Sequence, residues 1–230
     1  MKILVISPKA SEDSAKRLAR ELGAEYQNPY KTGRGSFKEY QLVINYGFSG
    51  NIITNANANV FNEPLSVRTC INKMTTLESL ALAGIPIPDY APFVKKNWDT
   101  VVCHTKPEGR KNEGIEYWHR DSGEPVPFAY LYTKYYDHRG EYRVVVLCGK
   151  VVGRYRKVER DGIWDLELRD KRGFEHMDAI CIRAAQALGI DYVGFDVLAQ
   201  TKHDCVIIEA NSGPILTDEA IEAFSELIGA

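Results

Sequence analysis

The sequence predicts an α+β protein in which a small β/α unit precedes a larger part built from helices and β-hairpins. Three observations support this fold class: a strand–helix opening at residues 3–22, a hairpin at residues 141–156 and a second strand pair at residues 192–214. The chain has 230 residues, and domains usually contain about 100–200 residues. We therefore expect subdomains that pack together rather than independent modules.

The first part of the chain alternates strands and a helix. Ile3–Ile6 is a short apolar run, and Ser11 then introduces apolar residues at helical spacing. We expect a second strand at residues 40–45 and a third at 51–54. No G-x-G-x-x-G motif follows the first strand, so a dinucleotide site is not indicated. These elements predict a small β/α domain over residues 1–65.

The middle of the chain combines one helix with two strands. Pro64 precedes a helix whose apolar residues keep one face until Gly84. Strands are expected at residues 101–103 and 114–119. Between them lies a charged, glycine-containing loop at residues 105–113. This arrangement predicts a hairpin with a long polar connection.

The second half of the chain contains most of the predicted strands. Residues 141–147 and 151–156 form a hairpin, and the polar stretch 157–173 is interpreted as a functional loop. Residues 174–188 have the spacing of an amphipathic helix. Thr217 is the predicted N-cap of a closing helix. No repeats or linkers interrupt this order.

The second strand pair is predicted to carry a metal site. With a two-residue loop at 202–203, Asp196 falls directly opposite Glu209. Asn211 projects from the same face two residues further on. The opposite face then carries six apolar side chains: Val193, Phe195, Val197, Val206, Ile208 and Ala210. Two carboxylates and an amide oxygen suit Mg²⁺, which prefers oxygen ligands.

The composition excludes several classes of protein. A net charge of −2 and a pI near 6.2 give no general electrostatic reason to bind nucleic acid. The five cysteines stand singly, so neither a zinc ribbon nor a disulfide framework is indicated. No run of about 18 apolar residues and no signal peptide is present. We expect no bulk nucleic-acid binding, no membrane association and a cytoplasmic location.

Six short motifs occur in the order that is typical of the ATP-grasp superfamily. They are Asn72-Lys73, Ala83-Gly-Ile-Pro-Ile-Pro88, the glycine-containing loop, Glu141-Tyr-Arg143, Gly194-Phe-Asp196 and Glu209-Ala-Asn211. The chain resembles short phage or bacterial ATP-grasp proteins related to the RimK-type and D-alanine–D-alanine-ligase-type enzymes. The resemblance extends from about Leu65 to Leu216.

This resemblance implies the α+β ATP-grasp fold, in which two α+β lobes sandwich ATP, preceded here by a small α/β pre-ATP-grasp domain. The implied boundaries are 1–65 for the small domain, 66–130 for the N-terminal lobe and 131–230 for the C-terminal lobe. The implied cofactors are ATP and Mg²⁺, with two ions expected and Mn²⁺ as an alternative.

The resemblance also assigns roles to the predicted metal ligands and to one lysine. Asp196, Glu209 and Asn211 match the residues that hold magnesium ions between the β- and γ-phosphates. Lys73 matches a lysine that contacts phosphate or nucleotide. These positions define the phosphate end of the implied site.

The loop that would cover the triphosphate contains Gly109 and Gly114, which permit close approach of the backbone to anionic oxygens. Its first basic residue has two candidates. His104 stands at the expected distance from the glycines, whereas Lys106 has the expected permanent charge. His104 would be neutral at pH 7 unless the phosphates raise its pKa. Both candidates are retained.

The remaining implied contacts lie in and after the connection to the second half of the chain. Lys134 and Tyr136 match hinge positions that contact adenine, and Glu141 matches an acid that binds ribose hydroxyls.

Several basic residues are candidates for the reaction itself. Arg143 contributes to the basic face of the hairpin, and Lys157 or Arg156 is the preferred residue to steady the γ-phosphate. Arg169 stands where related enzymes keep a basic residue near the acceptor. The segment around Arg169 departs from the RimK-like pattern, so the acceptor is not identified.

The resemblance implies an ATP-dependent carboxylate–amine ligase that releases ADP and phosphate through an acyl phosphate. A carboxylate–thiol ligase is a close variant. Two alternatives are kept: a kinase-like phosphotransferase and a nucleotide-binding module without turnover. The expected partners are a small-molecule or peptide carboxylate and an amine, and a partner protein could complete the acceptor site. The sequence predicts no oligomeric state.

Overall fold

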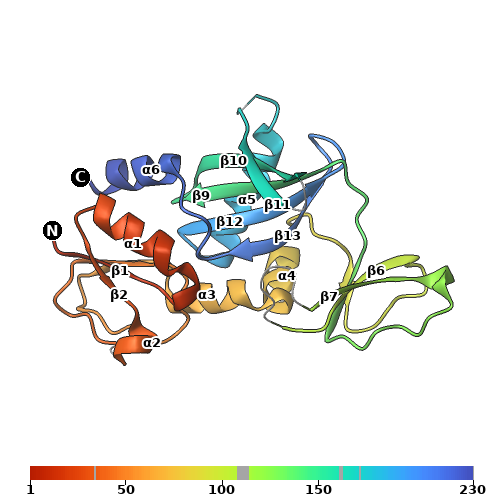
Figure 1. Cartoon of the computed structure of the whole chain (residues 1–230), viewed down its shortest axis with the longest axis horizontal. Coiled ribbons are helices and arrows are strands. Elements are labelled where there is room, and N and C mark those ends of the chain that lie inside the picture. The colour runs from red at the N-terminus through yellow and green to blue at the C-terminus, as the bar shows by residue number, and fades with distance from the viewer. Residues whose placement is uncertain (34, 108–113, 161–162, 171, 230) are drawn as a thin grey trace.

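Three β-sheets follow one another along the chain in the computed structural model (Figure 1). The structure describes residues 1–33, 35–107, 114–160, 163–170 and 172–229. The first sheet has the order β2-β1-β3-β4, the second β5-β8-β6-β7 and the third β11-β10-β9-β12-β13. Among the described residues, no helix combines the length and apolar character of a membrane span.

The first sheet is parallel and belongs to the N-terminal unit. Its strands are β1 (Ile3–Ile6), β2 (Glu25–Gln27), β3 (Leu42–Asn45) and β4 (Asn59–Phe61). Its helices are η1 (Lys9–Ser11), α1 (Glu12–Glu21) and α2 (Pro29–Thr32). The predicted strand at 51–54 is wrong. That segment forms only an isolated bridge between Ser36 and Ile53, and Ile53 is 53% exposed.

Two helices, α3 (Pro64–Ile71) and α4 (Lys73–Leu82), replace the single helix predicted after Pro64. Asn72 interrupts them with an extended backbone, φ −97° and ψ 110°. Its side chain accepts a hydrogen bond from the Thr75 N–H at 3.1 Å, so Asn72 caps α4. The break places Lys73 at the first position of α4.

The second sheet is small and antiparallel. Its strands are β5 (Tyr90–Ala91), β6 (Thr100–His104), β7 (Ile115–His119) and β8 (Leu131–Lys134), and η2 (Arg120–Ser122) follows β7. The two strands predicted here are confirmed. A separate core around the fully buried Trp98 and the buried Val101 holds this sheet together.

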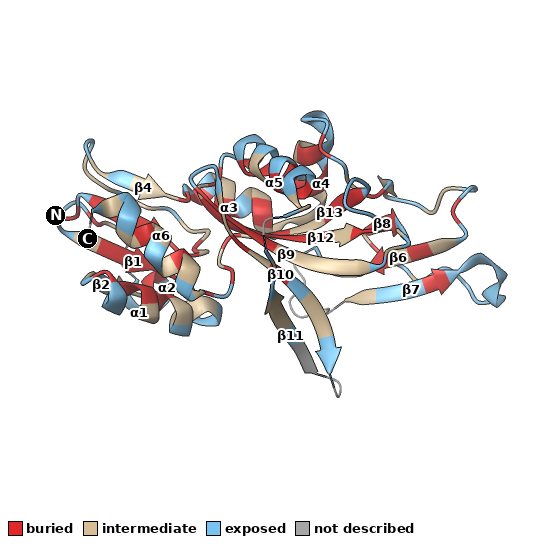
Figure 2. Cartoon of the chain, turned by 90° about the horizontal axis from the view of Figure 1, so that it is seen from above, coloured by how far each residue is buried: buried red, intermediate tan, exposed pale blue. Residues whose placement is uncertain are grey.

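The third sheet is antiparallel and lies between two helical layers. Its strands are β9 (Gly140–Leu147), β10 (Lys150–Arg160), β11 (Ile163–Leu168), β12 (Tyr192–Ala199) and β13 (Cys205–Asn211). The helices are α5 (Glu175–Leu188) and α6 (Asp218–Ile228). The interpretation of 157–173 as a loop is wrong for most of its length, because β10 continues and pairs with β11. These two strands project from the body (Figure 2).

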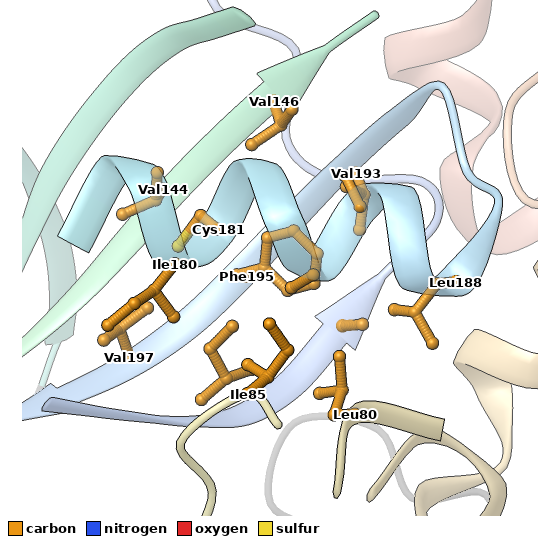
Figure 3. Packing of buried hydrophobic residues seen from close by; sticks show 14 of the residues in the cluster. Leu80, Ile85, Val144, Val146, Ile180, Cys181, Leu188, Val193, Phe195 and Val197 are labelled. Atoms are coloured by element: carbon orange, nitrogen blue, oxygen red, sulfur yellow. The ribbon is translucent and has the colours of Figure 1, made fainter. Parts of the chain in front are cut away.

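Each face of the third sheet has its own hydrophobic core. On one face, Val144, Phe195 and Val197 pack against Ile180 and other residues of α5 (Figure 3). Cys70 of α3 and Leu80 of α4 join this cluster, so these helices pack with the third sheet rather than with the second.

The other face of the third sheet packs against α6 and the N-terminal unit. Val145 and Tyr192 share one buried cluster with Phe224 of α6 and Leu18 of α1. The N-terminal unit therefore shares a core with the C-terminal sheet, as subdomains do. Boundaries at 65 and 130 remain a proposal.

A β-bulge shifts the register between β12 and β13. Asp196 pairs with Glu209 as predicted, but Val197 pairs with Ile207, which leaves Ile208 as an extra residue. Cys205 and Ile207 consequently take the core positions that were predicted for Val206 and Ile208. The two-residue loop is also wrong, since the Gln200 N–H donates to the Asp204 carbonyl.

Candidate active site

Two adjoining cavities form the cleft between the three sheets. The larger cavity, of about 750 Å³, lies between the second and third sheets, and the smaller, of about 380 Å³, lies between the N-terminal unit and the end of β13. Five residues line both cavities: Lys73, His104, Ile115, Ile208 and Glu209. The two cavities therefore adjoin at these residues.

The predicted metal ligands stand at the junction of the cavities. Asp196 and Glu209 are directly opposite each other on β12 and β13, and Asn211 follows opposite Gly194. Asp196 is only 4% exposed. Asp196 lines the larger cavity, Asn211 the smaller one and Glu209 both. The structure thus brings the three predicted ligands together.

Basic side chains surround these carboxylates. The Arg143 guanidinium donates to both carboxylate oxygens of Asp196, with Nη2 at 2.9 Å from Oδ2. Lys157 Nζ lies 3.0 Å from Asp196 Oδ2 and also forms an ion pair with Glu141. These contacts join the predicted ribose acid to a predicted metal ligand through one lysine.

These charges control protonation in the cleft. Burial alone would raise the pKa of Asp196, but the charge and hydrogen bonds of Arg143 and Lys157 outweigh burial and lower the pKa. Burial would likewise lower the pKa of Lys157, yet Asp196 and Glu141 raise it. Asp196 is therefore an ionised carboxylate and Lys157 a charged ammonium at neutral pH.

Gly194 makes room for the arginine. A Cβ atom at this position would lie 3.0 Å from Arg143 Cδ and 2.8 Å from Pro214 Cβ. Real Cβ atoms essentially never approach as close as 2.8 Å, and 3.0 Å is tighter than nine in ten real Cβ contacts. The absence of a side chain opposite Asn211 therefore lets Arg143 lie against β12 and reach Asp196.

The donor set fits Mg²⁺. Asp196, Glu209 and Asn211 offer hard oxygen atoms, and the lowered pKa of Asp196 keeps its carboxylate ionised. Within the described part of the chain, no group of three or more His, Cys, Asp or Glu residues could hold a metal by itself. Mg²⁺ commonly fills its remaining coordination positions with phosphate oxygens and waters.

Lys73 and His104 form the wall shared by the cavities. Lys73 Nζ lies 3.7 Å from Glu209 Oε2. His104 is 6% exposed, and its Nε2 lies 3.1 Å from Thr133 Oγ1. Burial, aided by the charge of Lys73, lowers the pKa of His104 to about 3. His104 is therefore neutral in this structure.

The predicted glycine loop begins beside this wall. Lys106 lines the smaller cavity, and Gly109 lies outside the described residues. Gly114 has φ +74°, and its carbonyl accepts the Thr105 N–H at 2.8 Å. This bond closes the base of the loop, and the positive φ explains the need for glycine. Both candidates for the basic residue, His104 and Lys106, thus face the cleft.

The predicted hinge lines the larger cavity. Lys134, Tyr136 and Glu141 all contribute to its wall. The Lys134 N–H donates to the Asp89 carbonyl at 2.8 Å, and the Tyr136 hydroxyl donates to Asp204. These bonds fix the hinge to β5 on one side and to the β12–β13 connection on the other.

Arg156 and Arg169 do not line either cavity, although both were predicted to be catalytic. Arg156 donates to the Arg139 carbonyl at 3.4 Å, and Arg169 forms an ion pair with Glu167. Successive side chains of a strand point to opposite faces, so Lys157 faces the cleft and Arg156 does not. Arg143 and Lys157, which were predicted together with them, line the larger cavity, and the catalytic roles of all four residues remain predictions.

Other lining residues had no signal in the sequence. Ile208 reaches the cleft only because of the bulge, and Leu166 does so from the unpredicted strand β11. Ser11 and Gly47 bring the N-terminal unit to the smaller cavity. No motif marked them, because the resemblance began only near Leu65.

Comparisons with known proteins find related sequences for much of the chain. Residues 130–227 match the family model of the RimK-like ATP-grasp domain. N-acetylaspartylglutamate synthase A of Homo sapiens is 28% identical over 184 residues, which cover 66% of this chain and 45% of that protein. Beta-citrylglutamate synthase B of Homo sapiens is 24% identical over 196 residues, 70% of this chain and 49% of that protein. The chain therefore spans about half the length of these curated relatives.

Solved structures give the fold over the whole chain. The ATP-grasp ligase PsnB, in complex with a minimal precursor, Mg and ADP, superimposes with a TM-score of 0.72 over 99% of this chain and 96% of that chain, at 16% identity. D-alanine–D-alanine ligase from Bacillus anthracis, in complex with ATP, gives 0.66 over 100% and 92%, at 13% identity. The predicted α+β ATP-grasp fold is confirmed, and residues 130–227 are similar to the RimK-like ATP-grasp domain.

Proposed function

We propose that this protein is an ATP- and Mg²⁺-dependent ligase that joins a carboxylate to an amine through an acyl phosphate and releases ADP and phosphate. One observation carries the proposal: the facing carboxylates Asp196 and Glu209 stand among Arg143, Lys157 and Lys73 where two cavities meet. The relatives and structural neighbours that bear the names of synthases and ligases support it.

The larger cavity is the proposed nucleotide site. Its volume of about 750 Å³ is within the usual range of about 300–1,000 Å³ for small-molecule and cofactor sites. Adenine would lie near Lys134 and Tyr136, ribose near Glu141, and the triphosphate would extend toward Lys73 and His104. This direction leads the γ-phosphate to the junction of the cavities.

The cation would lie at this junction. Asp196, Glu209 and Asn211 would hold Mg²⁺, which would supply positive charge to neutralise the phosphates of the nucleotide. Two ions, or Mn²⁺ in their place, belong to the same proposal. Arg143 orients Asp196 through its two hydrogen bonds, and Lys157 offers an ammonium beside the transferred phosphoryl group.

The smaller cavity is the proposed acceptor site. A substrate carboxylate there would attack the γ-phosphorus, form an acyl phosphate and release ADP. An amine would then attack the acyl carbon and release phosphate, with its proton passing to solvent. Positioning and charge stabilisation can carry both steps without a protein nucleophile. The substrates would be a small-molecule or peptide carboxylate and an amine.

An ADP-release screen tests this proposal. Amino acids, small peptides and carboxylated nucleobases are offered with Mg-ATP, and hydroxylamine is added to trap an acyl phosphate as a hydroxamate. We expect ADP, no AMP, and a hydroxamate with the correct carboxylate. A phosphate ester as the product would indicate the kinase-like alternative. Binding of Mg-ATP without ADP from any mixture would favour a nucleotide-binding module.

Paired variants connect the screen to the cleft. Glu209→Gln should abolish ADP release because it removes one of two carboxylates from the proposed cation site. Glu226→Gln makes the same change on the exposed side of α6 and should leave the rate unchanged. Normal ADP release by Glu209→Gln would contradict the assigned cation site.

A further inference from the structure

His104 is the titratable side chain that lies deepest in the wall between the two cavities. It lines both of them and is 6% exposed, at the end of β6. A buried histidine usually has a carboxylate or carbonyl partner that fixes its state. The partner here is the hydroxyl of Thr133, with Oγ1 at 3.1 Å from Nε2.

A hydroxyl partner permits either protonation state of the ring. Thr133 Oγ1 can donate to a bare Nε2 or accept from an Nε2–H group. The second ring nitrogen, Nδ1, has no hydrogen-bond partner among the residues that the structure describes. A proton could therefore be added to the ring without breaking its bond to Thr133, and the added charge would need a new anionic partner.

Burial, together with the charge of Lys73, lowers the pKa of His104, and the described groups that face the ring supply no opposing negative charge. Lys73 at the start of α4 repels a second positive charge, and the segment after β6 adds Lys106 to the smaller cavity. Glu209 of β13 is engaged by Lys73 at 3.7 Å. The neighbouring strands β7 and β8 present the uncharged residues Ile115 and Thr133. No carboxylate in this described set is positioned to charge the ring.

We propose that His104 takes up a proton when a nucleotide di- or triphosphate enters the cleft, and that the resulting imidazolium binds a phosphate oxygen. This inference rests on the proposed function only in that a nucleotide occupies the larger cavity. It makes phosphate recognition at this wall conditional on pH, whereas Lys73 supplies a permanent charge.

The size of the electrostatic effect is sufficient. One phosphate charge about 4 Å from the ring, at an effective dielectric constant of about 20, raises the pKa of an imidazole by roughly three. The phosphates would also engage Lys73 and so weaken the repulsion that lowers the pKa of His104 to about 3. Together these changes bring the ring into its titration range near neutral pH.

Calorimetry of Mg-ADP binding to the full chain measures the proton directly. Binding enthalpies at about pH 6.5 are compared in buffers of different ionisation enthalpy, with Mg²⁺ in saturating excess. The slope gives the protons bound per nucleotide, and we expect about 0.3 to 1 more proton in the wild type than in His104→Gln. His176→Gln is the matched control, since His176 lines neither cavity.

Affinity provides a second readout. Wild-type affinity for Mg-ADP should fall several-fold from about pH 6 to pH 8, beyond any change in the nucleotide itself. His104→Lys carries a permanent charge and should show a much flatter dependence. Equal proton uptake in wild type and His104→Gln would overturn the inference.

Nuclear magnetic resonance covers the case in which the variants do not fold. The Cε1–H signals of the five histidines of the wild type are followed with and without Mg-ADP. One buried histidine should shift to the imidazolium position on binding, and no such shift would overturn the inference.

The outcomes separate this inference from the proposed ligase activity. Proton uptake on His104 without ADP formation would leave the inference intact and contradict the ligase. ADP formation without proton uptake would support the ligase and overturn the inference about His104. Failure of the wild type to bind Mg-ADP would overturn both.

Discussion

Two buried arginine–aspartate pairs lie on opposite faces of the third sheet. Arg143 of β9 binds Asp196 of β12 on the cleft face, and Arg154 of β10 binds Asp178 of α5 on the other face. Both arginines use Nε and Nη2. The exposed fractions of the side chains are 14% and 6% in the first pair and 12% and 9% in the second. Burial and geometry alone do not distinguish the pairs.

Their surroundings differ. Asp196 also binds Lys157, faces Glu209 across the strands and borders a cavity. Arg154 and Asp178 connect the sheet to α5, and neither borders the two cavities. A buried ion pair therefore indicates a functional site only when further charges and open space converge on it. The pair of Arg154 and Asp178, in contrast, stabilises the packing of α5 against the sheet.

The largest expected effect concerns turnover on the cleft face. Asp196→Asn removes a carboxylate from the proposed cation site and should lower ADP release at least about 10³-fold, because stabilisation of phosphoryl charge contributes several kcal/mol. Asp178→Asn is the matched change on the other face, and its folded fraction should retain a rate within about threefold. If Asp196→Asn released ADP at a rate within tenfold of wild type, the cleft face could not be distinguished from the other face by its contribution to turnover.

The second effect concerns stability, and here Asp178→Asn rather than Asp196→Asn should cause the larger loss. Asp178→Asn leaves Arg154 buried without a carboxylate, and breaking such a pair costs about 3–5 kcal/mol. Asp196→Asn should cost less, because water in the cleft can solvate Arg143 and because Glu141 still binds Lys157. Urea unfolding at pH 7 measures both variants. Equal losses would show that the two pairs are equivalent in stability.

Much of the cleft could be predicted because its residues follow strand and cap rules. The pairing of Asp196 with Glu209 follows from the alternation of polar and apolar residues near the end of the hairpin. Gly189, with φ +59°, and Thr217, which accepts the Ala220 N–H, end and begin helices as predicted.

Three other features of the structure were not predicted. A bulge in the apolar run Val206–Ile208 changes no residue type, so Ile208 could not be assigned to the cleft. Strand β11 lies at a sheet edge, and its sequence Trp164-Asp-Leu-Glu-Leu168 alternates apolar and polar residues as a strand does, but it was interpreted as a loop together with its charged flanks. The helix break at Asn72 did have a signal, since asparagine is a favoured N-cap, but the apolar spacing continued across it.

The third effect tests the two faces with neighbouring residues of one strand. Lys157→Met removes an ammonium from the cleft, and charge-assisted hydrogen bonds contribute about 1.5–3 kcal/mol, so kcat/KM for ATP should fall roughly 10- to 150-fold. Arg156→Met makes a similar change on the opposite face and should alter kcat/KM less than about twofold. A larger loss in Arg156→Met than in Lys157→Met would reverse the assignment of faces.

The smallest effect is the dependence of stability on pH at the cleft wall. The folded-state pKa of His104 is about 3, below its ordinary 6.5, so between these values the unfolded chain binds the proton and the native ring does not. Stability therefore rises with pH in this window, and His104 contributes up to about 1.4 kcal/mol per pH unit. Urea unfolding from pH 4 to 6.5 measures how steeply the free energy of unfolding rises with pH. This slope should be smaller in His104→Gln than in the wild type, whereas His176→Gln should keep a slope steeper than that of His104→Gln by the same amount as the wild type. Identical slopes in wild type and His104→Gln would mean that His104 is as readily protonated in the native cleft as in the unfolded chain.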